Sequence, residues 1–290
     1  MLYRRKLLLY SIQRISYIAE KTRLQIAIFL LSQFQKKPSY SFFPYHYGAY
    51  SLVLANDLDL FFKENILKWD NGYILVKEYD VSDHIKPDDY KALNKVIEIL
   101  KEFNNINELL KYVYKQFPYY AARRINHHQI VQEQLELAIS VNKFDTPTVY
   151  TIGYEGIEIE DYINKLIRAG VKSVIDSRIN PVSMKYFFNK NELERNLKAA
   201  RIRYYHLPGL GIPSSLRKQY IPNNPDKLFD IYMNSILPNA QNELDRIKVI
   251  LEKDKYIAVT CFEKDEAMCH RSRISNYLCQ QWNIHEAHLK

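Results

Sequence analysis

Apolar residues in the first part of the chain recur every three to four positions, which is the spacing of one face of an α-helix. One such segment covers residues 2–19. A second begins near Thr22, a favourable residue type for a helix N-terminus, and stops before Pro38. A third covers residues 51–63. The pattern therefore predicts three helices in this part of the chain.

Two runs of β-prone residues, 66–69 and 73–76, are separated by Asp70-Asn71-Gly72. An Asn-Gly pair favours a tight hairpin because the turn needs positive φ at both central residues. Three helices closed by a two-stranded hairpin form the outline of a winged helix, a common DNA-binding module. The sequence therefore predicts a mostly helical, winged-helix-like domain over residues 1–125.

The remainder of the first half carries weaker patterns. Helical spacing at 88–103 and 107–117 predicts two helices that brace the winged unit. A linking helix is expected at 129–138. Because Pro147 biases the residue before it away from helix, the sequence predicts a linker and domain boundary over residues 126–147.

From residue 148 onward, short apolar runs alternate with amphipathic segments. The predicted strands are 148–152, 173–176, 203–207, 256–261 and a short one at 284–288, and the predicted helices are 158–169, 191–200, 271–281 and two more before the fourth strand. Such alternation is typical of a parallel sheet covered on both faces. The predicted fold class is thus α/β, with an open, mostly parallel, Rossmann-like sheet and helices on both faces over residues 148–290.

Positive charge is segregated along the chain, which carries a net charge of +8. Eight Lys and Arg residues face one acid in residues 1–50, and eleven face three acids in residues 166–219. Segregated positive charge attracts polyanions through the release of counterions, so a nucleic acid, above all DNA, or a nucleotide is the expected partner. The alternative is an ordinary solvated surface.

Basic and aromatic side chains on the first two predicted helices, and in an aromatic stretch expected to be a loop over 40–48, are the candidate nucleic-acid contacts. They are Arg4, Arg5, Lys6, Lys21, Arg23, Tyr45 and Tyr47. The third predicted helix, which would enter the major groove, carries Asp57 and Asp59, and carboxylates repel phosphate. Two alternatives follow: DNA held through an unusual face, or a winged helix that binds a protein partner.

The compartment is predicted from hydropathy and cysteine usage. No apolar run approaches the roughly 20 residues that cross a bilayer, and the N-terminus lacks a secretory signal, so a cytoplasmic protein with no membrane partner is expected. Cys261, Cys269 and Cys279 all lie in the last thirty residues, and an odd number favours free thiols over a disulfide framework.

Polar residues follow each of the first four predicted strands of the second half. They are Gly153 and Tyr154 after the first strand, Asp176 and Arg178 after the second, His206 at the end of the third, and Cys261 and Glu263 at the fourth. Because ligands of α/β proteins bind at the carboxyl ends of parallel strands, these side chains are expected to share a site. The structural alternatives are an Asp176–Arg178 ion pair, a core position for Cys261 and a hydrogen-bonded strand residue at His206.

The segment Cys269-His270-Arg271-Ser272 stands where the last predicted helix begins. Unpaired backbone donors, a partial positive charge and the arginine are expected to form a phosphate site there, and the same field is expected to lower the pKa of Cys269. The spacing of Cys261, Cys269 and His270 differs from that of known zinc sites. No metal and no cofactor are therefore predicted.

Four motifs follow one another along the second half. They are 151–156 (TIGYEG), 176–178 (DSR) with Pro181 and Ser183, 205–211 (YHLPGLG), and 260–263 (TCFE) with 269–271 (CHR). In this order they resemble the domain of unknown function 488 family. The resemblance implies an α/β fold with a motif cluster at strand ends, and it implies no activity. Ser177 stands where the family usually has valine, and Ile212 where it usually has a second glycine.

In the first half, residues 21–25, 45–51 and 112–121 resemble the N-terminal regions of a loosely related set of phage-associated and antitoxin-like bacterial proteins. That resemblance implies a regulatory or defence setting in a bacterium.

These observations lead to the hypothesis of a nucleic-acid-associated bacterial protein of the DNA-binding regulatory or phage-defence type. Its C-terminal site would recognise or process a nucleotide or a nucleic-acid strand. The hypothesis assigns phosphate neutralisation to Arg178 and Arg271, a general base to Asp176 or Glu263, a nucleophile to Cys261 or Cys269, and base stacking to Tyr154.

Two other classes of function stay open. One is a non-catalytic transcriptional regulator or modified-base sensor, and the other is a protein-protein adaptor. Convergence of Asp176, Glu263 and two cysteines favours an enzyme, whereas the lack of any established nuclease or metal motif favours pure binding.

Overall fold

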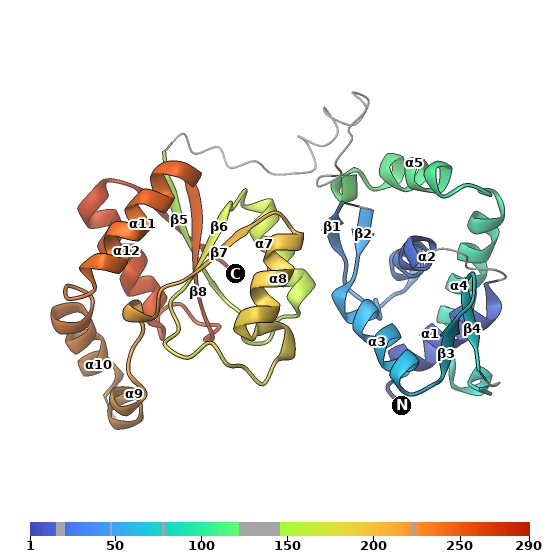
Figure 1. The fold of residues 1–290 in the computed structure, drawn as a ribbon, viewed down its shortest axis with the longest axis horizontal. Coiled ribbons are helices and arrows are strands. Elements are labelled where there is room, and N and C mark those ends of the chain that lie inside the picture. The colour runs from blue at the N-terminus through green and yellow to red at the C-terminus, as the bar shows by residue number, and fades with distance from the viewer. Residues whose placement is uncertain (16–20, 47, 77–78, 122–145, 222–223) are drawn as a thin grey trace. The chain divides into compact units, whose positions relative to one another are not determined.

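The computed structural model describes residues 1–15, 21–46, 48–76, 79–121, 146–221 and 224–290 (Figure 1). The chain divides into two compact units, Met1–Ile139 and Ser140–Lys290. The linking helix predicted at 129–138 lies outside the described residues, as does most of the predicted boundary. Within the described part of the chain, every helix is too short or too polar to cross a membrane.

The first unit consists of helices with two short hairpins. Its helices are α1 (Tyr3–Arg14), α2 (Lys21–Phe34), α3 (Leu52–Lys63), α4 (Pro87–Lys101) and α5 (Ile106–Gln116), its strands are β1 (Phe43–Tyr45), β2 (Gly48–Tyr50), β3 (Leu67–Trp69) and β4 (Tyr73–Leu75), and its 3₁₀ turns are η1 (Ser82–His84) and η2 (Pro118–Ala121). The helices predicted from apolar spacing are confirmed. Of the segment predicted at 2–19, Tyr3–Arg14 is helical, and residues 16–20 lie outside the described residues.

The first unit is built around α2. Its residues from Leu24 to Ser32 are all buried, so the helix is enclosed on every side and lies in the middle of the unit (Figure 1). The next helix, α3, begins where its pattern predicts, because the Ser51 hydroxyl accepts a hydrogen bond from Leu54 N at 3.2 Å and caps the helix. The hairpin of β3 and β4 is antiparallel, with Asn71 at φ 52° in the turn.

The aromatic stretch 40–48 was expected to be a loop, and this expectation is wrong in part. It contains β1, which pairs antiparallel with β2 through Phe43 and Tyr50. Phe43 and Ala49 are buried, and the Tyr45 ring stacks on Tyr50 with centroids 4.7 Å apart. The hairpin therefore depends on packing against the core, and such packing leaves no periodic signal in so short a run.

Asp57 on α3 is buried and paired, rather than exposed to a partner. Its carboxylate accepts hydrogen bonds from Arg4 Nε at 2.7 Å, from Arg5 Nε at 2.7 Å and from the Tyr40 hydroxyl at 3.0 Å. The sequence-based argument that Asp57 would repel phosphate on the third helix therefore does not apply, because its charge is buried and paired. These ion pairs connect α1 to α3. They also engage Arg4 and Arg5, which are two of the candidate DNA-binding residues.

We expect Asp57→Ala to lower the free energy of unfolding by about 2 to 3 kcal/mol, because it leaves two guanidinium groups and a buried hydroxyl without their acceptor. Asp59→Ala, on the same helix at an exposed position, is the matched control and should cost less than about 0.5 kcal/mol. Urea denaturation followed by circular dichroism measures both. Equal stability of the two variants would show that the ion pairs do not hold α1 against α3.

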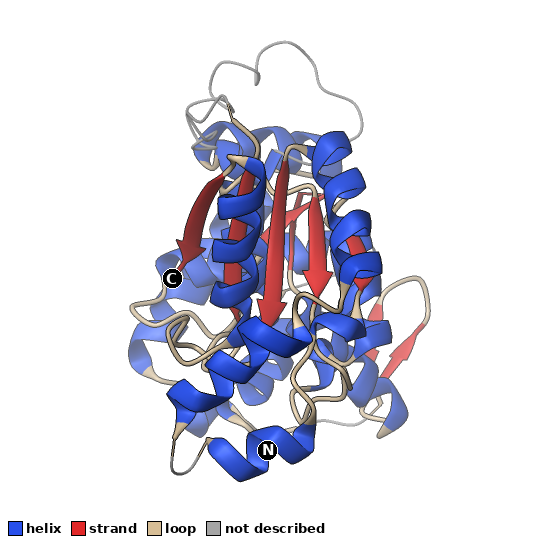
Figure 2. Ribbon diagram, turned by 90° about the vertical axis from the view of Figure 1, so that its left-hand side faces the viewer, coloured by secondary structure: helices blue, strands red, loops and turns tan. Residues whose placement is uncertain are grey.

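The second unit alternates strands and helices. Its strands are β5 (Thr148–Gly153), β6 (Ser173–Asp176), β7 (Arg203–His206), β8 (Tyr256–Cys261) and β9 (His285–Leu289); its helices are α7 (Ile159–Arg168), α8 (Lys190–Ala199), α9 (Ser214–Tyr220), α10 (Pro225–Ile231), α11 (Gln241–Asp254) and α12 (His270–Trp282), with short turns at η4 (Tyr186–Phe188), η5 (Pro208–Leu210) and η6 (Tyr232–Ile236). The strand order is β7-β6-β8-β5-β9, and all four pairings are parallel (Figure 2). The predicted α/β class with a parallel sheet is confirmed.

Helices cover both faces of this sheet, with α11 and α12 on one side and α7 and α8 on the other (Figure 1). The central strands β5, β6 and β8 are almost wholly buried, which explains their continuous apolar runs, whereas the edge strands β7 and β9 are partly exposed. Because all five strands point the same way, their carboxyl ends lie along one edge of the sheet. The loops that leave this edge carry the polar motifs.

Candidate functional site

The register of the sheet brings the strand-end residues to one edge. Gly153 pairs with Cys261, and Asp176 pairs with both Thr260 and His206. The sequence places these residues more than a hundred positions apart at the extremes, and the parallel pairing makes them neighbours. The expectation that the strand ends converge is therefore met.

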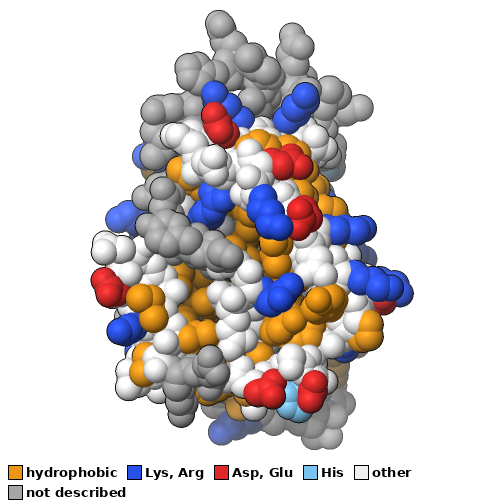
Figure 3. Space-filling view, turned by 90° about the vertical axis from the view of Figure 1, so that its right-hand side faces the viewer, with side chains coloured by type: hydrophobic (Ala, Val, Ile, Leu, Met, Phe, Trp, Pro, Cys, Tyr) orange, Lys and Arg blue, Asp and Glu red, His pale blue; other side chains and the backbone are white. Residues whose placement is uncertain are grey.

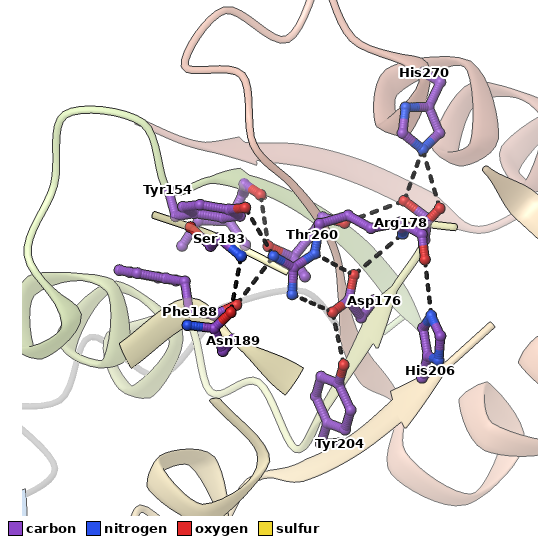
Figure 4. A network of polar contacts seen from close by, with 12 residues as sticks. Tyr154, Asp176, Arg178, Ser183, Phe188, Asn189, Tyr204, His206, Thr260 and His270 are labelled. Atoms are coloured by element: carbon purple, nitrogen blue, oxygen red, sulfur yellow. Dashed lines mark hydrogen bonds and ion pairs between the residues drawn. The ribbon is translucent and has the colours of Figure 1, made fainter. Parts of the chain in front are cut away.

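Asp176 and Arg178 form a buried, two-pronged ion pair at the end of β6 (Figure 4). Arg178 donates from Nε to Oδ1 at 2.8 Å and from Nη2 to Oδ2 at 2.5 Å. Burial by itself lowers the pKa of Arg178, but the hydrogen bonds and the charge of Asp176 outweigh it and raise that pKa above its ordinary value. The guanidinium is permanently charged, and its charge is neutralised within the protein.

The other donors around this pair are also used internally. Arg178 Nη1 donates to the Tyr154 hydroxyl at 2.7 Å and to the Phe188 carbonyl at 3.0 Å. The Tyr204 hydroxyl donates to Asp176 Oδ2 at 2.6 Å. Asp176 is fully buried, and both its oxygens accept hydrogen bonds, so the arrangement favours a structural role over that of a general base.

Tyr154 lines the cavity described below but offers no open ring face to a base. Its ring is stacked on Phe188, with centroids 4.4 Å apart and planes 10° apart, and the edge of Phe262 lies against it at 5.4 Å. Only 2% of Tyr154 is exposed. His206 is likewise occupied, because its Nε2 hydrogen-bonds the Arg178 carbonyl at 2.8 Å. These two residues hold the Arg178 loop in place.

A second cluster joins the end of β8 to the start of α12. The thiols of Cys261 and Cys269 both donate to Glu263 Oε2, at 3.1 and 3.0 Å. His270 Nδ1 lies 3.7 Å from the Cys261 sulfur and 3.8 Å from the Cys269 sulfur. The sulfur and ring-nitrogen atoms of the three buried residues all lie within 4.8 Å of one another, close enough for one cation to bridge them.

Ser177 connects the two clusters. His270 Nε2 lies 3.0 Å from the Ser177 hydroxyl and 3.4 Å from its carbonyl oxygen. The imidazole therefore reaches the residue between Asp176 and Arg178. The Asp176 carboxylate and the cluster of Cys261, Cys269 and His270 thus lie at the same edge of the sheet, as a shared site requires.

Burial changes the expected ionisation of the second cluster. Burial, together with its neighbour Cys261, raises the pKa of Cys269 well above its ordinary value, which corrects the expectation that the helix N-terminus lowers it. Burial also acts to raise the pKa of Glu263, but hydrogen bonds from the two thiols outweigh it, and the pKa is lowered. Burial acts to lower the pKa of His270, whereas Cys269 and Glu263 raise it more strongly.

Three further candidates contact the chain itself. Arg271 is 2% exposed and donates from Nη1 to the Glu263 carbonyl at 2.5 Å and from Nη2 to the Lys264 carbonyl at 3.0 Å. The Ser272 hydroxyl donates to the carbonyls of Glu266 and Cys269. Gly153 has the Glu263 backbone packed against its Cα. The loop between β8 and α12 is therefore held in shape by Arg271, Ser272 and Gly153. These three residues were expected to contact phosphate, and the structure gives them this internal role instead.

A cavity of about 500 Å³ opens at this edge of the sheet. It is lined by Tyr154, Ser177, Arg178, Ile179, Asn180, Val182, Ser183, Met184, Lys185, Gly211, Ile212, Arg217, Cys261, Phe262, Glu263 and His270. Of the predicted site residues, Tyr154, Arg178, Cys261, Glu263 and His270 face it.

The cavity also contains residues that the sequence reading missed, chiefly Ser177, Lys185 and Arg217. Lys185 and Arg217 belong to the basic stretch 166–219, and Ser177 is one of the two departures from the family pattern. The sequence therefore contained a feature that could have drawn attention to each of the three residues. These residues line the cavity because segments 179–186 and 211–217 fold over the strand ends. The spacing of residues in the sequence does not predict how such loops fold.

The candidate contacts of the first unit are dispersed. Besides Arg4 and Arg5, Arg23 is occupied, because its Nη2 donates to the carbonyls of Leu100 and Phe103 at the end of α4. Lys21 lies over the Trp69 ring at 5.7 Å. Lys and Arg side chains on the face drawn in Figure 3 stand apart among apolar and acidic ones.

The three remaining candidates of the first unit are Lys6, Tyr45 and Tyr47. Lys6 is half-buried on α1. Tyr45 packs in the β1–β2 hairpin, and Tyr47 lies outside the described residues. Of the six described candidates, Lys21 and Tyr45 line one pocket, whereas Arg4, Arg5 and Arg23 are held by internal acceptors.

Comparison with known proteins concerns the second unit. No curated protein and no solved structure matches the chain. Residues 158–278 match the model of a family described as Domain of unknown function DUF488. This segment includes β6, β7 and β8 and most of α12, with the Asp176 pair and the thiol-imidazole cluster. The C-terminal unit is therefore similar to this family over residues 158–278, a segment that contains the motifs after its second, third and fourth strands.

Proposed function

We propose that the C-terminal unit binds a nucleotide, or the end of a nucleic-acid strand, in the cavity at the carboxyl edge of its sheet. The observation that carries this proposal is the position of Arg217 on a cavity at the place where parallel α/β sheets bind ligands. Lys185 also lines the cavity, but its ammonium donates to the Ile157 carbonyl at 2.6 Å. Arg217 is exposed, and its guanidinium supplies several donors suited to phosphate oxygens. We therefore assign anion binding to Arg217, in place of Arg178 and Arg271, whose guanidinium groups are buried and bound within the protein.

Apolar side chains on the same cavity suit a base. Val182, Met184 and Phe262 line it and are 72%, 107% and 43% exposed. Exposed apolar groups of this kind lose unfavourable contact with water when a planar base covers them. Phosphate beside Arg217 and a base beside these side chains together account for both the polar and the apolar lining.

Within this proposal, turnover would depend on Glu263, Cys261 and His270, which line the cavity together with its cations and Tyr154. The Tyr154 hydroxyl is already engaged by Arg178. Asp176 is left out because it is buried behind Arg178. A non-catalytic regulator or modified-base sensor uses the same cavity without changing its ligand. A chromatographic assay of labelled nucleotides and oligonucleotides after incubation separates the two cases.

We expect Arg217→Gln to weaken binding of a short single-stranded oligonucleotide and to reduce the slope of log affinity against log salt by about one, because one phosphate contact is lost. Fluorescence anisotropy of the full chain over a series of salt concentrations measures both quantities.

Lys248→Gln, which removes one exposed positive charge on α11 away from the cavity, is the matched control and should leave the slope unchanged. Binding that is equally strong in the Arg217 variant and the original chain would refute the proposed site. Absence of any salt-dependent binding to nucleotides, DNA or RNA would instead favour the protein-protein adaptor.

The first unit has a supporting part in the proposed function. Three helices and the β3–β4 hairpin have the order of a winged helix, and we assign to this unit a winged-helix-like role in holding DNA or a protein partner in a bacterial regulatory or phage-defence setting. The hairpin exposes Trp69 and Ile74, with Lys21 beside the tryptophan, and this surface suits either partner. The internal pairing of Arg4, Arg5 and Arg23 favours the hairpin over the first helices as the contact.

A further inference from the structure

Four donor atoms from one short stretch of chain converge beside the cavity. They are the sulfurs of Cys261 and Cys269, His270 Nδ1 and Glu263 Oε2. The two sulfurs lie 3.7 and 3.8 Å from the nitrogen and 3.1 and 3.0 Å from the oxygen. Thiols, imidazole and carboxylate together form a donor set of the kind that binds zinc in proteins.

The separations of the two sulfurs from His270 Nδ1 agree with tetrahedral coordination. Zinc lies about 2.3 Å from a cysteine sulfur and about 2.0 Å from a histidine nitrogen, which at tetrahedral angles places the two ligands about 3.5 Å apart. The observed separations of 3.7 and 3.8 Å need a movement of only a few tenths of an ångström. The two sulfur-to-oxygen separations, 3.1 and 3.0 Å, must lengthen by about half an ångström to reach the tetrahedral value of about 3.5 Å, as the thiols lose the protons that they donate to Glu263.

The hydrogen bonds of His270 orient its free lone pair toward the sulfurs. The Ser177 hydroxyl has a single proton, and it can donate that proton to the Thr260 carbonyl at 3.1 Å. His270 Nε2, which faces the Ser177 hydroxyl and carbonyl oxygens, is then the protonated ring nitrogen. Nδ1 is left unprotonated on the side of the two sulfurs, and this is the arrangement of a metal-binding histidine whose other nitrogen is held by an oxygen acceptor, here chiefly the Ser177 hydroxyl at 3.0 Å.

Neighbouring residues at 269 and 270 can face one point because the chain changes conformation between them. Cys269 is extended, with φ −134° and ψ 142°, and His270 is the first residue of α12. The two side chains therefore leave the backbone in directions that a continuous helix or strand would not allow. This explains why ligand spacing in the sequence does not resemble that of common zinc sites.

We propose that Cys261, Cys269, His270 and Glu263 bind one Zn²⁺ ion. Binding releases the two thiol protons to solvent, and the ion takes two thiolates, a neutral imidazole and a carboxylate as its four ligands. The ion would link the end of β8 to the start of α12 and set the shape of the cavity wall. This inference does not rest on nucleotide binding, which the cavity can provide with or without the ion. A bound ion would, however, occupy Cys261, His270 and Glu263 and so exclude them as nucleophile or general base of a turnover reaction.

The test is a metal titration of the full chain after chelator treatment under reducing conditions. Zn²⁺ added in competition with a chromophoric chelator should bind at one ion per chain. Co²⁺ in its place should give the visible absorption of a tetrahedral site and a near-ultraviolet sulfur-to-metal band. Cys261→Ser and Cys269→Ser should each abolish stoichiometric binding, whereas Cys279→Ser, which removes the remaining thiol, should retain it.

Ser177→Ala provides a finer test of the geometry. It removes the hydroxyl that orients His270, and zinc affinity should fall about 10- to 100-fold with the stoichiometry unchanged. An unchanged affinity would show that His270 is not a ligand held in this way and would overturn the four-ligand assignment.

A measurement on the unaltered chain decides the matter if the serine variants do not fold. Zinc should slow alkylation of Cys261 and Cys269 by at least tenfold and leave Cys279 unaffected, as read by mass spectrometry of the peptides. Absence of stoichiometric zinc in the reduced chain, equal alkylation with and without zinc, or loss of the ion in Cys279→Ser would overturn the proposal.

Discussion

Asp176→Ala should lower the free energy of unfolding of the C-terminal unit by about 3 to 5 kcal/mol. The substitution leaves the Arg178 guanidinium 93% buried without its counter-charge, since only 7% of that side chain is exposed. It also removes the acceptor of the Tyr204 hydroxyl. The cost arises from the stranded charge, because removal of one partner of a buried pair is far more expensive than the net contribution of the pair.

Chemical denaturation monitored by circular dichroism measures this effect. Asp230→Ala, at an exposed position on α10, is the matched control and should change stability by less than about 0.5 kcal/mol. The double variant Asp176→Ala with Arg178→Met should recover part of the loss, since it removes the stranded cation. A double variant less stable than Asp176→Ala alone would show that Arg178 contributes mainly through Tyr154 and Phe188.

Gly153→Ala should destabilise the same unit by about 3 kcal/mol or more and displace Glu263. A Cβ at this position would lie 1.8 Å from the Glu263 carbonyl oxygen and 2.8 Å from its carbonyl carbon. Both are backbone atoms, so the strand and the loop must separate, and overpacking against backbone cannot be relieved by a change of rotamer. The same carbonyl accepts the Arg271 hydrogen bond, which would be lost with the shift.

Gly156→Ala is the control variant, because it adds the cost of a strained backbone conformation without any steric clash. Gly156 has φ 76°, and a Cβ there would meet nothing within 4 Å. Its replacement should cost about 1 kcal/mol from backbone strain alone. Thermal unfolding of the two variants gives the comparison, and a smaller loss at Gly153 than at Gly156 would contradict the close approach of the Glu263 loop.

Several elements could be predicted because their signal is local. The α/β class follows from alternating apolar runs and amphipathic segments, and the β3–β4 hairpin follows from Asn71-Gly72. Ser51 marks the start of α3 through a hydrogen bond made within four residues. In the hairpin and the helix cap the interaction that sets the structure lies between near neighbours in the sequence. The strands of the sheet pair over long distances, but the pattern that identifies each strand and helix is local.

The β1–β2 hairpin and the buried Asp57 could not be predicted in the same way. Both depend on contacts with residues distant in the sequence, since Asp57 is paired with Arg4 and Arg5 from another helix. The charge of a side chain is visible in the sequence, whereas its burial and its partner are not. An assignment of cations to DNA from charge alone therefore overlooked their internal acceptors.

The sequence by itself determined which residues stand at the ends of the parallel strands, because the strand pattern and the rule for parallel sheets locate them. Only the tertiary structure decided how these residues divide between support and site. Asp176, His206 and Arg271 are turned into the protein, while Arg217 is brought to the cavity from a distant segment. The physical reason is that hydrogen-bond partners and burial depend on the path of loops in space, and no periodicity in the chain encodes that path.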